Sequence, residues 1–147
     1  MDAKEYLEAY SNYAWIERQC LEECEDEREA LREIVHYYNQ YATETWRKEN
    51  GKSIQTCIDH CNQLTERANY VAEKKNAILK MIESIPGMDG DVIRLRYIDG
   101  LKWEEITERV FYSWNGVFKC HNRALLKIQE KLDAIDNREN GEEAYPI

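Results

Sequence analysis

The first 85 residues of the chain contain a single glycine and no proline, so few residues in this segment would interrupt a helix. The chain has 147 residues with six glycines and two prolines, and five of the glycines lie at or after Gly87. Apolar residues in the first segment recur at spacings of three and four, which is typical of one face of a helix. We therefore predict an all-α protein that begins with a long, coiled-coil-like helical hairpin.

Two helices are expected in this hairpin, at Asp2–Thr45 and Ile54–Ile85. The turn between them is placed at Arg47–Ser53, because Asn-Gly is a strong turn dipeptide and Ser53 can cap the helix that follows. Pro86–Gly90 is expected to end the second helix and to act as a hinge.

Each predicted helix carries an apolar seam. In the first helix, with Glu17 and Arg28 off pattern, the seam is Leu7, Tyr10, Ala14, Glu17, Leu21, Cys24, Arg28, Leu31, Val35 and Tyr38. In the second, with Lys75 off pattern, it is Ile54, Cys57, Cys61, Leu64, Ala68, Val71, Lys75, Ile78, Ile82 and Ile85. Such seams close within one chain or between chains, so a monomer, a homodimer and a higher oligomer all stay open.

Five cysteines without a secretion signal predict free thiols. The pairs Cys20–Cys24 and Cys57–Cys61 each span one helical turn, which is a spacing that could hold zinc. With the turn at its predicted position, however, Cys24 would lie opposite residues near Ala77 and far from Cys57. The two pairs would meet only if the turn lay near Gln40–Tyr41 or if the helices paired between chains. We interpret these cysteines as small buried seam residues, with a zinc site and disulfides as alternatives, and we predict no metal or cofactor.

The net charge of −9 at pH 7 is unevenly distributed along the chain. Residues 1–85 hold 17 acidic and 11 basic side chains, whereas Asp91–Lys131 holds 6 acidic and 8 basic ones. Basic charge concentrated in one segment is the distribution expected where a chain contacts nucleic acid. No apolar run approaches the ~18 residues that cross a bilayer, and the N-terminus lacks the form of a signal peptide. We expect a cytoplasmic protein with no membrane contact.

The basic segment has the parts of a helix-turn-helix. A helix at Asp91–Asp99 is followed by a break at Gly100, a short helix at Trp103–Val110, a connection at Phe111–Ser113 and a longer helix at Trp114–Asp133. Three regions are thus predicted: a helical hairpin for oligomerisation at 1–85, a helix-turn-helix module at 86–136 and an acidic, flexible tail at 137–147.

In a helix-turn-helix, the N-terminal residues of the second helix face base edges in the major groove. Residues placed for contact with bases or phosphates are Ser113, Trp114, Asn115, Phe118, Lys119, Asn122, Arg123 and Lys127. Asn can bind adenine, Lys can bind guanine, and basic side chains along the helix can bind phosphates. Trp103 is predicted to pack across the module, whereas His121 either contacts phosphate or packs against the preceding helix.

Four short sequences in Asp91–Leu132 resemble those of a known protein family. They are Leu95-Arg96-Tyr97, Gly100-Leu101-Lys102-Trp103-Glu104-Glu105-Ile106, Tyr112-Ser113 and His121-Asn122-Arg123-Ala124-Leu125. The segment resembles region four of sigma factors and, more narrowly, small phage and prophage proteins related to the ArpU- and RinA-type late transcription regulators. The first two thirds of the chain, from Ala3-Lys4-Glu5-Tyr6-Leu7 to Ile85-Pro86, resemble that family only in outline. The resemblance implies a phage-encoded DNA-binding regulator in the host cytoplasm, with RNA polymerase as a further partner.

The chain departs from the family pattern at two points. Phe111 stands where the family usually has glycine, and a bulky residue at positive φ costs ~1 kcal/mol or more, so we expect a different turn. Asn115-Gly116 stands where the family tends to have a basic residue, and Gly116 weakens the helix by roughly 1 kcal/mol relative to alanine. Both departures predict weaker or altered DNA binding.

Our first hypothesis is a sequence-specific DNA-binding transcription regulator whose partner is double-stranded DNA. A protein-interaction factor that binds RNA polymerase or another partner is the alternative, which the acidic charge and Trp114 favour. A DNA-packaging recognition subunit is a second alternative, which a ring-shaped assembly would support. The sequence contains no Gly-rich phosphate loop, nucleophile elbow, HExxH motif or other catalytic constellation, so we predict that the protein is not an enzyme.

Overall fold

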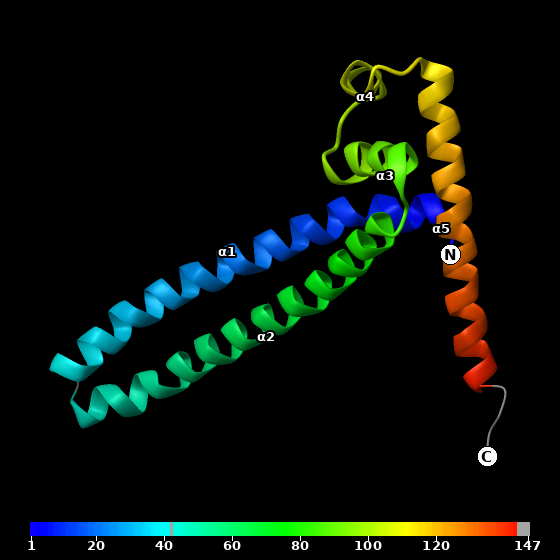
Figure 1. The fold of residues 1–147 in the computed structure, drawn as a ribbon. Helices are drawn as coiled ribbons and strands as arrows, with labels where there is room; N and C mark the ends of the chain where they lie inside the picture. Colours follow the sequence, from blue (N-terminus) through cyan, green and yellow to red (C-terminus); the bar gives the residue numbers. More distant parts are fainter. Residues whose placement is uncertain (42, 144–147) are drawn as a thin grey trace. The chain divides into compact units, whose positions relative to one another are not determined.

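The computed structural model describes residues 1–41 and 43–143, in which every regular element is helical. In chain order the elements are α1 (Ala3–Tyr41), α2 (Glu44–Glu83), α3 (Gly87–Ile93), the π-helical turn η1 (Arg94–Ile98), α4 (Trp103–Val110) and α5 (Trp114–Glu143) (Figure 1). The predicted all-α class and the long N-terminal helix pair are confirmed. Over the described ranges, the helices lack the combination of length and apolar character that crossing a membrane requires.

Contacts within the chain define two compact units, which we describe separately. The hairpin unit is Tyr13–Glu73, and the C-terminal unit combines Met1–Asn12 with the chain from Lys74 onward. Both long helices therefore contribute residues to both units. The regions predicted from the sequence follow chain order instead and divide the chain after residue 85.

The turn of the hairpin unit lies earlier in the chain than the sequence indicates. Helix α2 passes through Asn50-Gly51 without a break, so the turn predicted at Arg47–Ser53 is wrong. The backbone N–H of Trp46 donates to Thr43 Oγ1 at 3.2 Å, which is an N-cap that starts the helix. Because the Asn50 amide donates to the Trp46 carbonyl at 2.9 Å, this polar side chain is also accommodated within the helix.

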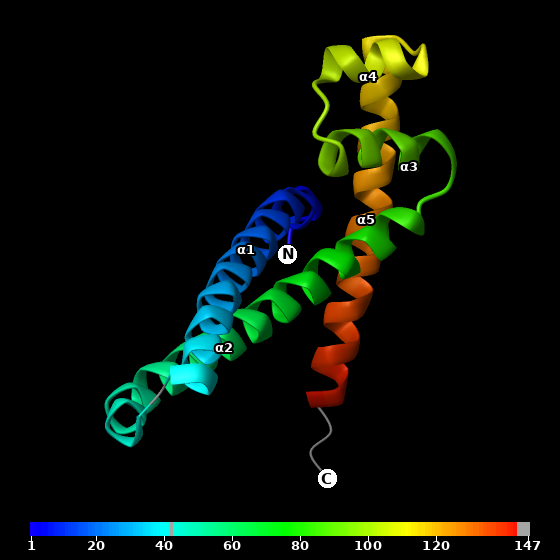
Figure 2. The same cartoon turned by 90° about the vertical axis from the view of Figure 1, so that its left-hand side faces the viewer.

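Helices α1 and α2 run antiparallel (Figures 1 and 2), and with the turn in this position cysteines from both helices lie in one buried cluster. This buried cluster of the unit consists of Cys20, Cys24, Cys61, Leu64 and Ala68. Cys24 Sγ lies 3.8 Å from the Cys61 carbonyl oxygen, and nearer the turn the ring of Tyr38 lies 5.6 Å from that of Trp46. Every predicted seam position of the second helix is buried or half-buried, so that seam is confirmed.

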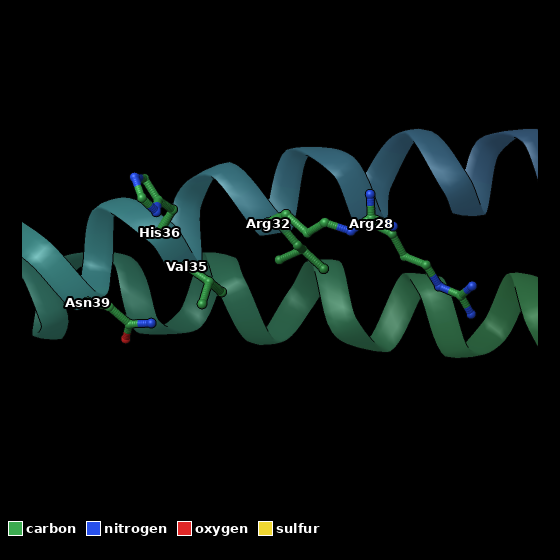
Figure 3. A pocket seen from close by; sticks show the side chains of 6 residues that line it. Arg28, Arg32, Val35, His36 and Asn39 are labelled. Atoms are coloured by element: carbon green, nitrogen blue, oxygen red, sulfur yellow. The ribbon is translucent and has the colours of Figure 1, made fainter.

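The seam predicted for α1 is displaced by one residue over part of its length. Leu21, Arg28 and Val35 are exposed, whereas Cys20 is buried and Ile34 is half-buried. An α-helix has 3.6 rather than 3.5 residues per turn, so a strict heptad drifts around a straight helix. Arg28 and Val35 instead line a groove of about 460 Å³ along α1 (Figure 3).

In the C-terminal unit, α3 and α4 pack against the N-terminal half of α5 (Figures 1 and 2). Their shared core contains Val92, Ile106, Val117 and Cys120. Helix α3 begins at Gly87, inside the predicted hinge, so the start predicted at Asp91 is wrong. A Cβ atom on Gly90 would lie 2.1 Å from the Ile85 carbonyl oxygen, so only glycine permits this close backbone approach.

The second half of α5 is held by the chain start and by the end of α2. The backbone N–H of Ala3 donates to Gln129 Oε1 at 2.7 Å, and Lys131 Nζ donates to Ser84 Oγ at 2.6 Å. The helix continues to Glu143, past residue 136 where the predicted module ends. Residues 144–147 of the predicted tail lie outside the described range.

Candidate nucleic-acid interface

Helices α4 and α5 are joined by Phe111–Ser113, the connection predicted from the sequence. The backbone N–H of Gly116 donates to Ser113 Oγ at 3.1 Å, which makes Ser113 the N-cap of α5. Phe111 adopts the left-handed conformation, with φ 57° and ψ 36°, and its side chain is 92% exposed. The turn thus has a backbone conformation that favours glycine, and the expected change of turn at Phe111 is wrong.

Gly116 fits this turn for a steric reason. A Cβ atom there would lie 3.3 Å from Ser113 Oγ and 3.4 Å from Tyr112 Cδ2. The Ser113 hydroxyl must stay in place to cap the helix, so a larger residue would crowd the cap. The same glycine that lowers helix propensity therefore leaves room for the capped turn.

Five of the predicted contact residues lie together on the solvent side of the first turns of α5. We call this surface the exposed face; it consists of Trp114, Asn115, Phe118, Lys119 and Asn122. The stacked rings of Trp114 and Phe118 lie 6.0 Å apart, and Phe118 also lies 4.8 Å from Trp103. Within the described part of the chain, no side-chain hydrogen bond or ion pair involves Asn115 or Lys119. The exposed face thus has polar groups free for a partner.

The two other predicted contact residues on α5 have partners within the protein. Arg123 donates to both carboxylate oxygens of Asp89, with Nη2 to Oδ1 at 3.1 Å and Nε to Oδ2 at 3.3 Å. Lys127 Nζ lies 3.5 Å from Asp89 Oδ2. Both basic side chains are still largely exposed, so they hold α3 against α5 while they face solvent.

Asp89 is a residue whose role the sequence analysis missed. Burial alone would raise the pKa of this carboxyl group, but hydrogen bonds with Arg123 and Cys120 and the positive charges of Arg123 and Lys127 outweigh burial and lower it. The residue lies between Gly87 and Gly90, in the segment that the sequence assigns to a hinge. The signal that identifies its helix is the spacing of Met88 and the buried Val92, four residues apart.

An aromatic cluster lies behind the exposed face. The His121 side chain is buried, its Nε2 lies 2.8 Å from the Tyr97 hydroxyl, and its ring lies 4.9 Å from Trp103. The predicted packing of Trp103 is confirmed, and of the two roles for His121 the structure favours packing. Burial lowers the pKa of His121 and raises the pKa of Tyr97 to about 12, so both groups are neutral near pH 7.

A hollow of about 610 Å³ adjoins Phe118 and Asn122 and is large enough for a small molecule. Its basic side chains are engaged, since Lys4 pairs with Glu8 at 3.9 Å and Arg96 donates to the Leu101 carbonyl at 3.0 Å. The hollow and the exposed face share Phe118 and Asn122.

The cysteines of the hairpin unit act as seam residues, as predicted: Cys20, Cys24 and Cys61 are buried, and Cys57 is half-buried. Burial raises the pKa of Cys61 to about 11, and its hydrogen bond to Glu27 acts in the same direction. Both effects favour the protonated form of this buried thiol. Across residues 1–41 and 43–143, His, Cys, Asp and Glu side chains form no group of three or more that could hold a metal ion.

Comparison with known proteins identifies no relative from which a function could be transferred to this geometry. No protein-family model matches the chain, and no curated protein or solved structure is significantly similar to it.

Proposed function

We propose that the protein is a sequence-specific DNA-binding transcription regulator, in which α4 and α5 form a helix-turn-helix and the start of α5 enters the major groove. The observation that carries the proposal is the exposed face, which follows a capped three-residue connection and leaves Asn115 and Lys119 free. A helix of this length is ~45 Å long, far more than the groove is wide, so only its first turns would contact bases. The phage origin and the host-cytoplasmic location rest on the sequence resemblance alone.

Charge supports this assignment of the contact surface. The chain is acidic as a whole, but the segment Ser113–Lys131 carries Lys119, Arg123, Lys127 and Lys131 against the single acid Glu130. Basic side chains that approach phosphates release counterions from the duplex, which makes binding strongly dependent on salt. In the proposal, Ser113 and the free N–H groups at the start of α5 would bind a phosphate beside the bases.

The experiment begins with selection of binding duplexes from a random-sequence pool by the full-length protein at low salt. Fluorescence anisotropy with the selected duplex, at salt concentrations from ~50 to ~200 mM, then measures affinity and its salt dependence. Lys119→Ala and Asn115→Ala are expected to weaken binding, the second by about 1–3 kcal/mol with loss of preference at one base pair. Lys52→Ala and Asn62→Ala, at exposed positions of α2, are the matched controls.

Failure to select any duplex at ~50 mM salt would contradict the proposal and would direct the search to RNA polymerase and other protein partners. Light scattering on the same sample separates the remaining alternative, since a DNA-packaging subunit is expected to form rings rather than monomers or dimers.

A further inference from the structure

The exposed face contains an aromatic row that is rigid and accessible. Trp114 and Phe118 lie four residues apart, so both side chains project from the same side of α5. They are 48% and 37% exposed, which leaves a substantial apolar surface in solvent. The ring of Trp103 supports Phe118 from behind at 4.8 Å. These two rings therefore offer a partner an apolar contact that is already ordered before binding.

A polar row runs beside the aromatic one. Asn115 and Lys119 are again four residues apart, and Asn122 follows at the next turn. An asparagine amide can donate to and accept from adenine N7 and N6 at once, which identifies an A·T pair in the major groove. Guanine is bound by arginine or lysine, but Arg123, the one arginine near the start of α5, is held by hydrogen bonds to both carboxylate oxygens of Asp89. Lys119 is then the one free side chain of this face that suits guanine, against two asparagines that suit adenine. The chemistry of this face therefore favours A·T over G·C pairs.

Phe111 is a further exposed aromatic residue, in the connection that precedes α5. Its left-handed backbone conformation costs ~1 kcal/mol for a residue other than glycine, and 92% exposure means that its ring contributes almost no burial to the fold. Neither the backbone geometry nor the packing of the turn accounts for a phenylalanine here. An apolar contact made on binding accounts for both features.

We infer that the start of α5 recognises A·T base pairs and that Trp114 and Phe118 contact the C5-methyl groups of thymine, with Phe111 at the edge of the same contact. This inference rests on the proposed DNA-binding function and adds the base chemistry that the exposed face would bind. Thymine alone among the bases presents a methyl group in the major groove, beside the adenine edge that asparagine binds. The aromatic and polar rows together match that pattern, and Lys119 supplies the positive charge that complements the duplex.

The test uses the best duplex from the random-sequence selection, with each thymine replaced in turn by uracil, which differs only by the missing C5-methyl group. Removing one buried methyl is expected to weaken binding about fourfold at each contacted position, with no change at other thymines of the same duplex. Replacing adenine by 7-deazaadenine, which lacks the N7 acceptor, is expected to weaken binding at the positions contacted by asparagine.

Substitutions then locate the contact on the protein. At the thymine that Trp114 contacts, Trp114→Ala is expected to bind the thymine and uracil duplexes with equal affinity. At the other contacted thymines, the variant should still bind the thymine duplex more tightly. If circular dichroism shows that Trp114→Ala disturbs the fold, Phe118→Leu is the second variant for the same test, because it preserves an apolar contact with Trp103. Binding that is insensitive to uracil at every position would overturn this inference and leave the proposed function intact. If no duplex is selected at all, the proposed function itself fails.

Discussion

The hairpin unit and the C-terminal unit are stabilised in different ways. The core of the hairpin repeats small apolar side chains along two helices, with three thiols among the five residues of its buried cluster. The C-terminal unit buries Asp89 and His121, each with specific partners, beside its apolar core. A repeated seam permits several registers, whereas a buried polar group is satisfied in only one arrangement. The unit that presents the exposed face is thus the one with the more specific contacts.

Substituting Asp89 tests this difference most strongly. Asp89→Asn removes the charge that holds Arg123 and Lys127, so we expect the C-terminal unit to lose about 2 kcal/mol of stability. Glu27→Gln is the matched substitution in the hairpin unit, where the carboxylate pairs with exposed His60, and we expect a loss below about 1 kcal/mol. Hydrogen exchange measured by mass spectrometry reports on each unit separately. Equal losses in the two units would contradict the comparison.

Lowering the pH should separate the contributions that the two buried polar groups, Asp89 and His121, make to the stability of the C-terminal unit. The pKa of Asp89 is lower in the folded protein than the ~3.9 of an unfolded chain, so its contribution is full above that pH and is lost as pH falls through the folded pKa. The pKa of His121 is also lowered by burial, so its effect begins earlier, below about pH 6.5. Urea unfolding between pH 7 and 3 should show both losses. Asp89→Asn should abolish the loss of stability below pH 4 and leave the loss that begins below about pH 6.5.

Phe111 is the residue whose substitution should separate stability from binding. Phe111→Gly relieves the left-handed strain, so we expect the C-terminal unit to gain ~1 kcal/mol in urea unfolding. The same variant should bind the selected duplex more weakly, because the exposed ring is lost. Phe111→Asn, which also tolerates this conformation, is the control with a polar side chain. A loss of stability in both variants would show that the ring packs within the fold.

The position of the hairpin turn can be tested with two caps. Thr43→Ala removes the N-cap of α2 and is expected to cost ~1 kcal/mol. Ser53, the cap expected from the sequence, lies inside α2, so Ser53→Ala should leave stability unchanged or raise it by a few tenths of a kcal/mol. Hydrogen exchange of the hairpin unit measures both changes. The opposite ranking would place the turn at Asn50-Gly51.

The cap at Ser113 could be predicted from the sequence because its hydrogen bond closes within three residues, to the Gly116 N–H. The position of the hairpin turn could not be predicted from such a local signal, because it depends on how two long helices pair. Because α2 begins at Glu44, Cys24 lies opposite Cys61 and Tyr38 opposite Trp46, and these contacts outweigh the local preference of Asn50-Gly51. The ion pairs of Asp89 could not be predicted either, since they join it to residues 34 and 38 positions away. Local signals in the sequence thus predict the exposed face better than its support.

The smallest expected effect compares two glycines in helices. Gly51→Ala places a Cβ atom where no atom lies within 4 Å, so the hairpin unit should gain the full ~1 kcal/mol of helix propensity. Gly116→Ala has the same propensity gain, but its Cβ would lie 3.3 Å from the Ser113 hydroxyl that caps α5. We therefore expect a smaller gain or none in the C-terminal unit, measured by urea unfolding of both variants. Equal gains in stability would mean that the Ser113 hydroxyl moves aside at little cost in free energy. The turn before the exposed face would then be less rigid than its geometry indicates.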